Sequence, residues 1–203
     1  GKNKNLIVID MGTIGPTAAK EIAMMLEKNK VDFIDAPVTG STPKAKTGEL
    51  TIFVGGKKEV YEKIKPVLLA MGKNIHYVGP TGSGQAIKMI NNQVIATTIQ
   101  AVMEGMLLAD AMGLDRKKAA KILKTVPAFS FMMNLKLPNY VDNKFPLLFS
   151  TANMKKDLEL AYLEMKKGKK NLPVLKKLVE IYKKASKAGL LNEDFASIIK
   201  IID

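Results

Sequence analysis

The stretch "DAPVTGSTPKAKTGELTIFVGG", residues 35–56, places many small residues between two apolar segments. The first apolar segment, "VDFIDAP" (31–37), overlaps the beginning of this stretch, and the second, "LTIFVGG" (50–56), forms its end. Apolar runs of this length predict strands that are buried on both faces. So many small residues straight after a buried strand are unusual for an ordinary connector, and they would let backbone groups approach a ligand closely. The alternative is a glycine-rich turn that serves only close packing of strand and helix.

The neighbouring sequence alternates between strand and helix patterns. "NLIVID" (5–10) predicts a buried strand, and Pro16 is well placed to open a helix that runs to Leu26. "KEVYEKIKPVLLAMG" (58–72) has helical spacing, and "NIHYVG" (74–79) predicts a short fourth strand. This alternation over about 80 residues predicts an α/β domain with a mainly parallel sheet.

Beyond residue 80 the pattern is helical throughout. Residues 84–112 contain no proline and predict one helix of about 40 Å. Asp115 and either Ser150 or Thr151 are candidate N-caps, and Gly168 is a candidate helix end. We therefore predict a partial Rossmann-type α/β domain over residues 1–80, then an all-α domain over 81–203, joined by a long interdomain helix.

The charge balance is strongly basic, with 32 Lys plus Arg against 19 Asp plus Glu and a net charge of +13. Arg116 is the single arginine in the sequence. Proteins that read DNA bases rely on arginine, so we do not expect nucleic acid as a partner, although nonspecific attraction to phosphates stays open. The simplest interpretation is a lysine-coated soluble protein whose surface attracts small anionic substrates.

Composition also excludes several kinds of site. The sequence has no cysteine, which rules out disulfides, thiolate catalysis and zinc–thiolate centres. The one histidine, His76, cannot form a His-pair metal site, so we expect no metal and place His76 near a strand end. We find neither a signal peptide nor an apolar run of membrane-spanning length, and we expect a cytoplasmic protein without a membrane partner.

The predicted α/β domain is short. We count three or four strands, whereas doubly wound domains have about five or six. No Gly-x-Gly-x-x-Gly motif follows the first strand, and a buried strand at the chain start leaves an unpaired edge. We expect the second half of a nucleotide-binding domain whose first half lies outside this sequence, and we expect the 203 residues alone to be inactive.

Four blocks, in this order, carry a family resemblance: "DMGTIGP" (10–16), "DAPVTGSTPKAKTGEL" (35–50), "GSGQAIKMINNQ" (82–93) and "FSTANMKKDLELA" (149–161). Together they resemble the β-hydroxyacid dehydrogenase family, which includes 3-hydroxyisobutyrate dehydrogenase, tartronate semialdehyde reductase and the glyoxylate/succinic semialdehyde reductases. The resemblance implies NAD or NADP as cofactor, a 6-phosphogluconate dehydrogenase-like helical domain, and a homo-oligomer, either dimer or tetramer, formed through that domain.

The resemblance assigns the quoted loop to the carboxylate of a small anionic hydroxyacid or semialdehyde substrate. Thr39 would supply a hydroxyl, and Gly40 and Ser41 would supply amides. Thr39 stands where the family has serine, and Ser41 stands where it has glycine. Both changes add bulk, so we expect a pocket of altered shape.

Lys88 and Asn92 are four residues apart and share a helix face. Reduction of an aldehyde by hydride creates alkoxide charge, which a nearby donor stabilises and protonates. The resemblance assigns this catalytic general acid/base role to Lys88 and substrate binding to Asn92. Spacing alone favours the alternative that Lys88 is an exposed lysine. Asn91 is set aside because it points about 100° away.

The resemblance assigns Thr13, Phe149 and Lys156 to cofactor binding. Thr13 follows a strand carboxyl end, where such ligands bind. Phe149 would line the nicotinamide pocket, although core packing explains it nearly as well. Lys156 precedes Asp157, which we expect to anchor its helix.

The sequence thus predicts an oxidoreductase that interconverts a small β-hydroxyacid and its semialdehyde by hydride transfer with NAD(P). The alternative is a degenerate family member that binds nucleic acid or a protein partner through its basic surface without catalysis. The intact "GSGQAIKMINNQ" block favours the enzyme, because a degenerate member has no physical reason to keep lysine and asparagine on one helix face.

Overall fold

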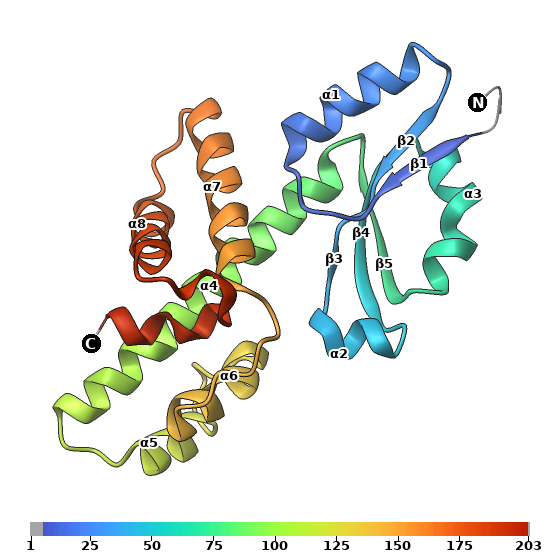
Figure 1. The fold of residues 1–203 in the computed structure, drawn as a ribbon. Coiled ribbons are helices and arrows are strands. Elements are labelled where there is room, and N and C mark those ends of the chain that lie inside the picture. Colours follow the sequence, from blue (N-terminus) through green and yellow to red (C-terminus); the bar gives the residue numbers. More distant parts are fainter. Residues whose placement is uncertain (1–5, 203) are drawn as a thin grey trace. The chain divides into compact units, whose positions relative to one another are not determined.

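The computed structural model describes residues 6–202 and divides into two compact units, residues 1–91 (unit 1) and 92–203 (unit 2). Helix α4 (Ser83–Ala111) runs through the division (Figure 1). The division into compact units therefore lies within α4, at Asn91 and Asn92, whereas the last strand ends at Gly79. The physical reason is that the first turns of α4 are hydrogen-bonded to the sheet of unit 1.

Unit 1 contains a sheet and three helices (Figure 1). The strands are β1 (Ile7–Asp10), β2 (Asp32–Asp35), β3 (Val38–Thr39), β4 (Leu50–Gly56) and β5 (Gly72–Gly79). The helices are α1 (Pro16–Glu27), α2 (Ser41–Lys46) and α3 (Lys58–Leu69). Each strand and helix predicted for residues 6–79 is present, and β3 and α2 are additional.

Most residue pairs of the sheet are parallel, as predicted, but the sheet also contains antiparallel pairing. β1 pairs with β2, and β4 with β5, in parallel, but β2 and β3 both pair with β4 antiparallel. The quoted stretch causes the reversal, because Val38 pairs with Ile52 and Thr39 with Thr51 along the edge of β4. A parallel connection needs a crossover of a dozen or more residues, usually a helix, whereas here the chain turns back on itself after α2.

The core of unit 1 lies between the central strands and α3. α3 contacts β2, β4 and β5, while α1 contacts β2. The buried apolar residues of this cluster are Ile34, Ala36, Ile52, Val54, Val60, Tyr61, Ile64 and Leu68. On β4, Ile52 and Val54 are both 0% exposed, whereas Phe53 between them is only partly buried.

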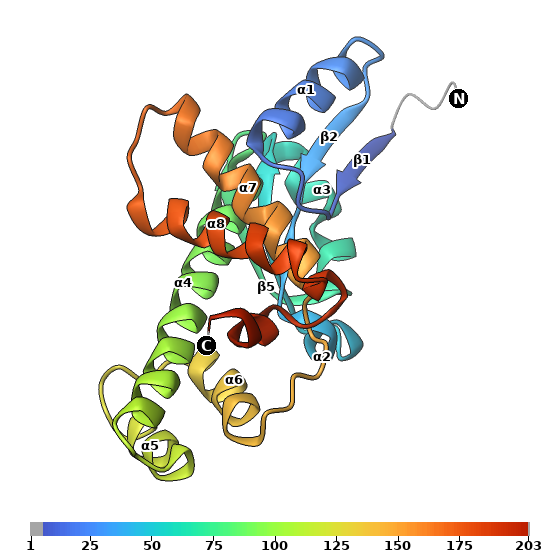
Figure 2. The same cartoon turned by 60° about the vertical axis from the view of Figure 1, so that its left-hand side comes forward.

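Unit 2 is helical, as predicted. After the rest of α4 come α5 (Arg116–Leu123), α6 (Phe131–Asp142), α7 (Thr151–Lys167), α8 (Pro173–Lys187) and the short 3-10 helices η1 (Leu190–Asn192) and η2 (Phe195–Ile201). α7 and α8 lie side by side (Figures 1 and 2). One apolar cluster joins these helices, and it includes Met103, Met106, Leu137, Leu158 and Tyr182.

Local capping signals read from the sequence are confirmed. The Asp115 side chain accepts a hydrogen bond from Lys118 N at 2.8 Å and begins α5. Ser150, and not Thr151, is the N-cap of α7, since its side chain accepts from Asn153 N at 3.2 Å, and Gly168 is the C-cap that follows Lys167. Helix α6 was not predicted, because Pro138 lies inside it and weakens the helical pattern.

Helix α4 corrects one expectation from the sequence. It has no charged residue between Lys88 and Glu104, and it is long and apolar enough to span a membrane by length and composition alone. The core helix of a soluble protein passes the same test. The sequence reading overlooked this run because asparagine, glutamine and threonine side chains interrupt it.

Candidate active site

The start of α4 is held on the sheet by a buried carboxylate, Asp35, at the end of β2. Its Oδ1 accepts a hydrogen bond from Gly82 N at 2.7 Å, and its Oδ2 accepts from Gln85 N at 2.9 Å. The side chain has no exposure. Burial raises the pKa of Asp35 above its ordinary value, although these backbone donors act in the opposite direction. A negative charge here also complements the amino end of the helix.

Gly84 permits this close approach. A Cβ at this position would lie 2.5 Å from the carbonyl oxygen of Phe53 and 2.9 Å from that of Asp35. Both obstacles are backbone atoms, which cannot move aside as a flexible side chain can. Glycine is therefore required for α4 to begin directly at the carboxyl end of β2.

Gln85 links α4 to the loop between β1 and α1, which carries Thr13. Gln85 Oε1 accepts from Ile14 N at 3.0 Å and from Gly15 N at 3.2 Å. Gln85 Nε2 donates to Gly12 O at 2.9 Å. Thr13 is thus flanked on both sides by backbone groups bound to one side chain of α4, and it lies just beyond the carboxyl end of β1.

Lys88 follows Gln85 by three residues on α4 and is 7% exposed. Within residues 6–202 the only other buried lysine is Lys136 of unit 2, which forms an ion pair with Asp194 at 2.6 Å. Burial of a lysine is costly and unusual. The alternative that Lys88 is one of the exposed surface lysines is therefore wrong.

The predicted substrate loop adopts an unusual backbone. Gly40 has φ 130°, and a Cβ there would lie 2.8 Å from Lys44 Cβ, so only glycine fits. Ser41 opens α2 with φ 61°, a left-handed conformation that costs free energy for serine. Thr39 Oγ1 lies 3.5 Å from Asn91 Nδ2. Sequence reasoning set Asn91 aside, and the structure instead gives it a contact with this loop.

In unit 2 the predicted residues Asn92 and Lys156 meet at Asp157. Asn92 is 3% exposed, and its Nδ2 donates to Asp157 Oδ2 at 2.5 Å. Lys156 Nζ lies 2.7 Å from Asp157 Oδ1. Asp157, buried on α7, thus anchors both side chains and fixes the orientation of the Asn92 amide.

Phe149 is held by a different group in unit 2. The backbone N–H groups of Leu148 and Phe149 donate to Asp194 Oδ2 at 2.9 and 3.2 Å. The Phe149 ring packs edge-on against Phe195, with 6.2 Å between ring centroids. Phe149 is only partly buried, so core packing accounts for part of its ring.

The predicted residues therefore fall into two sets. Unit 1 holds Lys88 with the loops of Thr13 and Thr39, and unit 2 holds Asn92, Lys156 and Phe149. Sequence reasoning missed Asp35, Gln85 and Asn91 as organising residues. The one available signal was a carboxylate at the end of an apolar strand, which requires hydrogen-bond partners when it is buried. In the described part of the chain, no cluster of three or more His, Cys, Asp or Glu residues could hold a metal ion.

Comparison with known proteins identifies two family models along the chain. The model for the NAD-binding domain of NADP-dependent 3-hydroxyisobutyrate dehydrogenase matches residues 82–202. The model for the NAD-binding domain of 6-phosphogluconate dehydrogenase matches residues 1–79. The two matches meet near residue 80, ahead of the division between the compact units.

Among individual proteins, 2-(hydroxymethyl)glutarate dehydrogenase of Eubacterium barkeri is 32% identical over 96% of this chain and 65% of its own length. The 2-hydroxy-3-oxopropionate reductase of Escherichia coli is 31% identical over 98% of this chain and 68% of its own length. Mycobacterium tuberculosis 3-hydroxyisobutyrate dehydrogenase, solved with L-serine, is 30% identical with a TM-score of 0.88, over 97% of this chain and 69% of that chain. The chain spans 54–68% of the length of the curated relatives it matches.

Proposed function

Because the chain belongs to the β-hydroxyacid dehydrogenase family, we propose that the protein is an oxidoreductase that interconverts a small β-hydroxyacid and its semialdehyde. NAD or NADP is the cofactor, as both matching family models are NAD-binding domains. Lys88 is the general acid/base. The observation that carries the proposal is the burial of Lys88 in the same unit as the loop of Thr39.

The residues present suit a nicotinamide dinucleotide. Thr13 offers a hydroxyl at the carboxyl end of β1, where nucleotides bind to α/β sheets. Lys156 offers an ammonium group with 48% side-chain exposure, and Phe149 offers an aromatic ring. These three groups match a phosphate-bearing ligand with a flat ring, and we propose them as cofactor contacts.

The cofactor, when bound, supplies or accepts the hydride. Lys88 donates a proton to the substrate oxygen as alkoxide charge develops in reduction, and accepts the hydroxyl proton in oxidation. The Thr39 hydroxyl and the amides of Gly40 and Ser41 bind the substrate carboxylate. Asn92 orients the substrate, and its hydrogen bond to Asp157 reduces the freedom of the amide before substrate binds.

The test is an assay of small semialdehydes with NADH and NADPH, using the full-length gene product that contains these residues. We expect Lys88→Ala to lower kcat by roughly 10²- to 10⁴-fold, the range attributed to general acid–base catalysis. Lys20→Ala, which changes an exposed lysine on α1, is the matched control and should leave kcat unchanged. Wild-type kcat in Lys88→Ala would refute the assignment of Lys88.

We also propose that the protein forms a homo-oligomer through α4. Ile90, Val94, Ala101 and Leu108 recur at helical spacing along one face of α4 and are all exposed. An apolar stripe of this kind on a helix favours association with another apolar surface.

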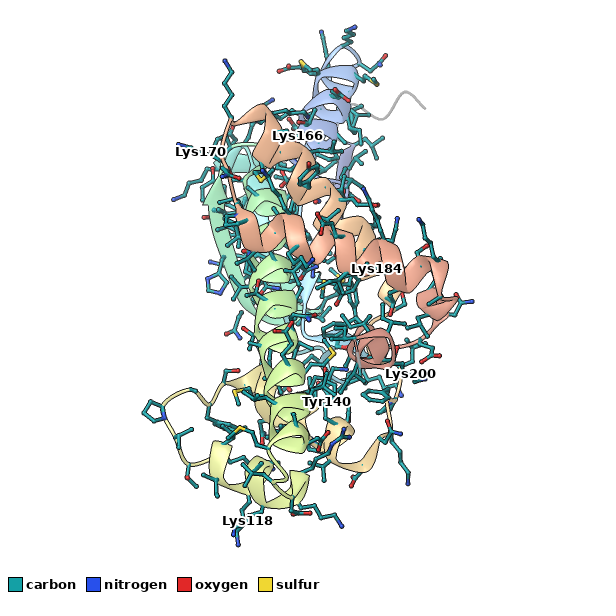
Figure 3. All side chains as sticks on the ribbon, turned by 90° about the vertical axis from the view of Figure 1, so that its left-hand side faces the viewer. Lys118, Tyr140, Lys166, Lys170, Lys184 and Lys200 are labelled. Atoms are coloured by element: carbon teal, nitrogen blue, oxygen red, sulfur yellow. The ribbon has the colours of Figure 1, made fainter. Side chains whose placement is uncertain are left out.

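One observation favours the alternative of a binding protein without catalysis. Residues 166–187 contain nine lysines and one glutamate, a net charge of +8. Lys166, Lys170 and Lys184 belong to this segment, on α7, the loop after it and α8 (Figure 3). Binding to random duplex DNA that weakens steeply with salt, together with no nicotinamide turnover, would support this alternative.

A further inference from the structure

We propose that Gln85 is a positioning residue, which holds the loop of residues 12–15, and with it Thr13, on the helix that carries Lys88. The inference rests on the proposed function, because it assumes that Thr13 contacts the cofactor. It adds a residue that neither composition nor the roles assigned by family resemblance identified. Gln85, the 12–15 loop and Lys88 all lie within unit 1.

Both ends of the Gln85 amide are engaged with this loop. Oε1 accepts from Ile14 N and Gly15 N, and Nε2 donates to Gly12 O. Nε2 also lies 3.4 Å from Asp10 Oδ2 at the end of β1. The hydrogen bonds therefore reach the backbone immediately before and immediately after Thr13.

Gln85 is itself fixed. It has no solvent exposure, and its backbone N–H donates to the buried carboxylate of Asp35. Its side chain thus extends from a helix turn that is anchored to the sheet. Lys88 lies one turn further along the same helix, so the loop of Thr13 and the lysine share one rigid support.

The chemistry of the site requires an amide. The loop presents two N–H donors and one carbonyl acceptor, and glutamine can satisfy both kinds of group. Glutamate can accept but, when ionised, cannot donate to Gly12 O, and it would place a negative charge near Asp10. Leucine would leave all three backbone groups without this partner, which is costly at a buried site.

The experiment compares Gln85→Leu and Gln85→Glu with Gln93→Leu in the full-length gene product. Gln93 is a matched control, since its Nε2 donates to Thr97 Oγ1 on the same helix at 3.2 Å and to no loop. The dissociation constants of NADH and NADPH are measured by fluorescence titration. Hydrogen exchange of the Ile14 and Gly15 amides and steady-state kinetics are measured in parallel.

We expect Gln85→Leu to weaken cofactor binding about tenfold, the loss corresponding to one buried hydrogen bond. Exchange of the Ile14 and Gly15 amides should accelerate, while the KM for the semialdehyde stays within about twofold. Gln85→Glu keeps the two acceptor contacts, so its loss of cofactor affinity should be smaller. Gln93→Leu should change none of these quantities.

A purely structural role gives a different result. Gln85→Leu would then lower thermal stability, or kcat through loss of active protein, with an unchanged cofactor dissociation constant, and that result would overturn the inference. Unchanged exchange at Ile14 and Gly15 would also overturn it. If the wild type binds cofactor but turns over no semialdehyde, the proposed function fails while the effect of Gln85 on binding is still measured. If the wild type binds neither cofactor, both fail.

Discussion

Glu49, the residue immediately before β4 in unit 1, lies between two lysine ammonium groups. Lys44 Nζ donates to its carboxylate at 2.8 Å, and Lys73 forms a second ion pair with it. These contacts, led by the hydrogen bond from Lys44, lower the pKa of Glu49 to about 2. A carboxyl group with a lowered pKa stabilises the fold above its unfolded pKa of 4.5, and this stabilisation is lost as pH falls toward 2.

We expect Glu49→Gln to reduce the free energy of unfolding at neutral pH and to make the acid decline between pH 4.5 and about 2 shallower. Urea unfolding of unit 1 at stepped pH measures this. The raised pKa of Asp35 changes the free energy of unfolding with pH in the opposite direction. Asp35 is present in both wild type and Glu49→Gln, so its effect cancels when the two proteins are compared. Glu21→Gln on α1 is the control, and an equal change in that variant would contradict the prediction.

Lys136 presents a different case, because its charge is buried with that of Asp194. The same carboxylate also accepts from the backbone of Leu148, Phe149 and Ala196. Tyr140, labelled on α6 in Figure 3, is fully buried in the same unit. Burial raises its pKa, and the charge of Asp194 adds to that effect. The ion pair therefore organises the segment that carries Phe149.

We expect Lys136→Met to lower the free energy of unfolding of unit 2 by roughly 3–5 kcal/mol, because it leaves Asp194 buried without its cation. Chemical denaturation followed by circular dichroism measures this. Lys144→Met removes an exposed lysine from the loop after α6 and serves as the control. A loss below about 1 kcal/mol in Lys136→Met would show that the pair is dispensable.

Helix α4 has apolar residues on two faces, one buried in a core and one exposed. Its buried positions, among them Ile99, Met103 and Met106, belong to the core of unit 2. Its exposed stripe of Ile90, Val94, Ala101 and Leu108 is apolar, with the exposed Glu104 one turn before Leu108. This combination explains why α4 resembles a membrane span in composition, since apolar residues cover more than one of its faces.

If the stripe forms an oligomer interface, Leu108→Glu should lower the mass of the particle in solution, because a charge in an apolar interface is costly to desolvate. Light scattering coupled to size exclusion measures the mass. Met24→Glu on α1 is the matched control, since Met24 is 58% exposed, close to the 59% of Leu108. An unchanged mass for Leu108→Glu at equal concentration would rule out this face.

At the scale of the molecule, residues 6–202 form two separate apolar clusters, one in each unit. The cluster of unit 1 contains eight buried residues, and that of unit 2 is larger. Buried apolar area is the main source of stability, so we expect unit 1 to unfold at the lower temperature.

We predict two calorimetric transitions that respond to different substitutions. Ile52→Ala in β4 should lower the midpoint of the first transition, and Leu158→Ala in α7 should lower that of the second. Each removes a fully buried side chain and costs about 2–5 kcal/mol in its own unit. Equal shifts of one common transition by either variant would show that the units unfold together.

Much of the fold was predictable from short-range patterns in the sequence. The strands β1, β2, β4 and β5, the extent of α4, and the caps at Asp115 and Ser150 depend on residues within a few positions of one another. Hydrophobic periodicity and capping hydrogen bonds are local, so they leave a readable signal. The order of the four sequence blocks likewise identified the family, which the comparisons confirm.

The contacts that organise the candidate site join distant residues, and no local pattern announces them. Gln85 meets the 12–15 loop across about 70 residues, Asn92 meets Asp157 across 65, and Lys136 meets Asp194 across 58. The antiparallel return of β3 onto β4 depends on edge pairing, which propensity does not encode. The burial of Lys88 and Lys136 also depends on how distant segments pack together. The sequence therefore specified the residue types and the elements, whereas the partner of each buried polar group arose only when the chain folded, because burial makes those long-range hydrogen bonds necessary.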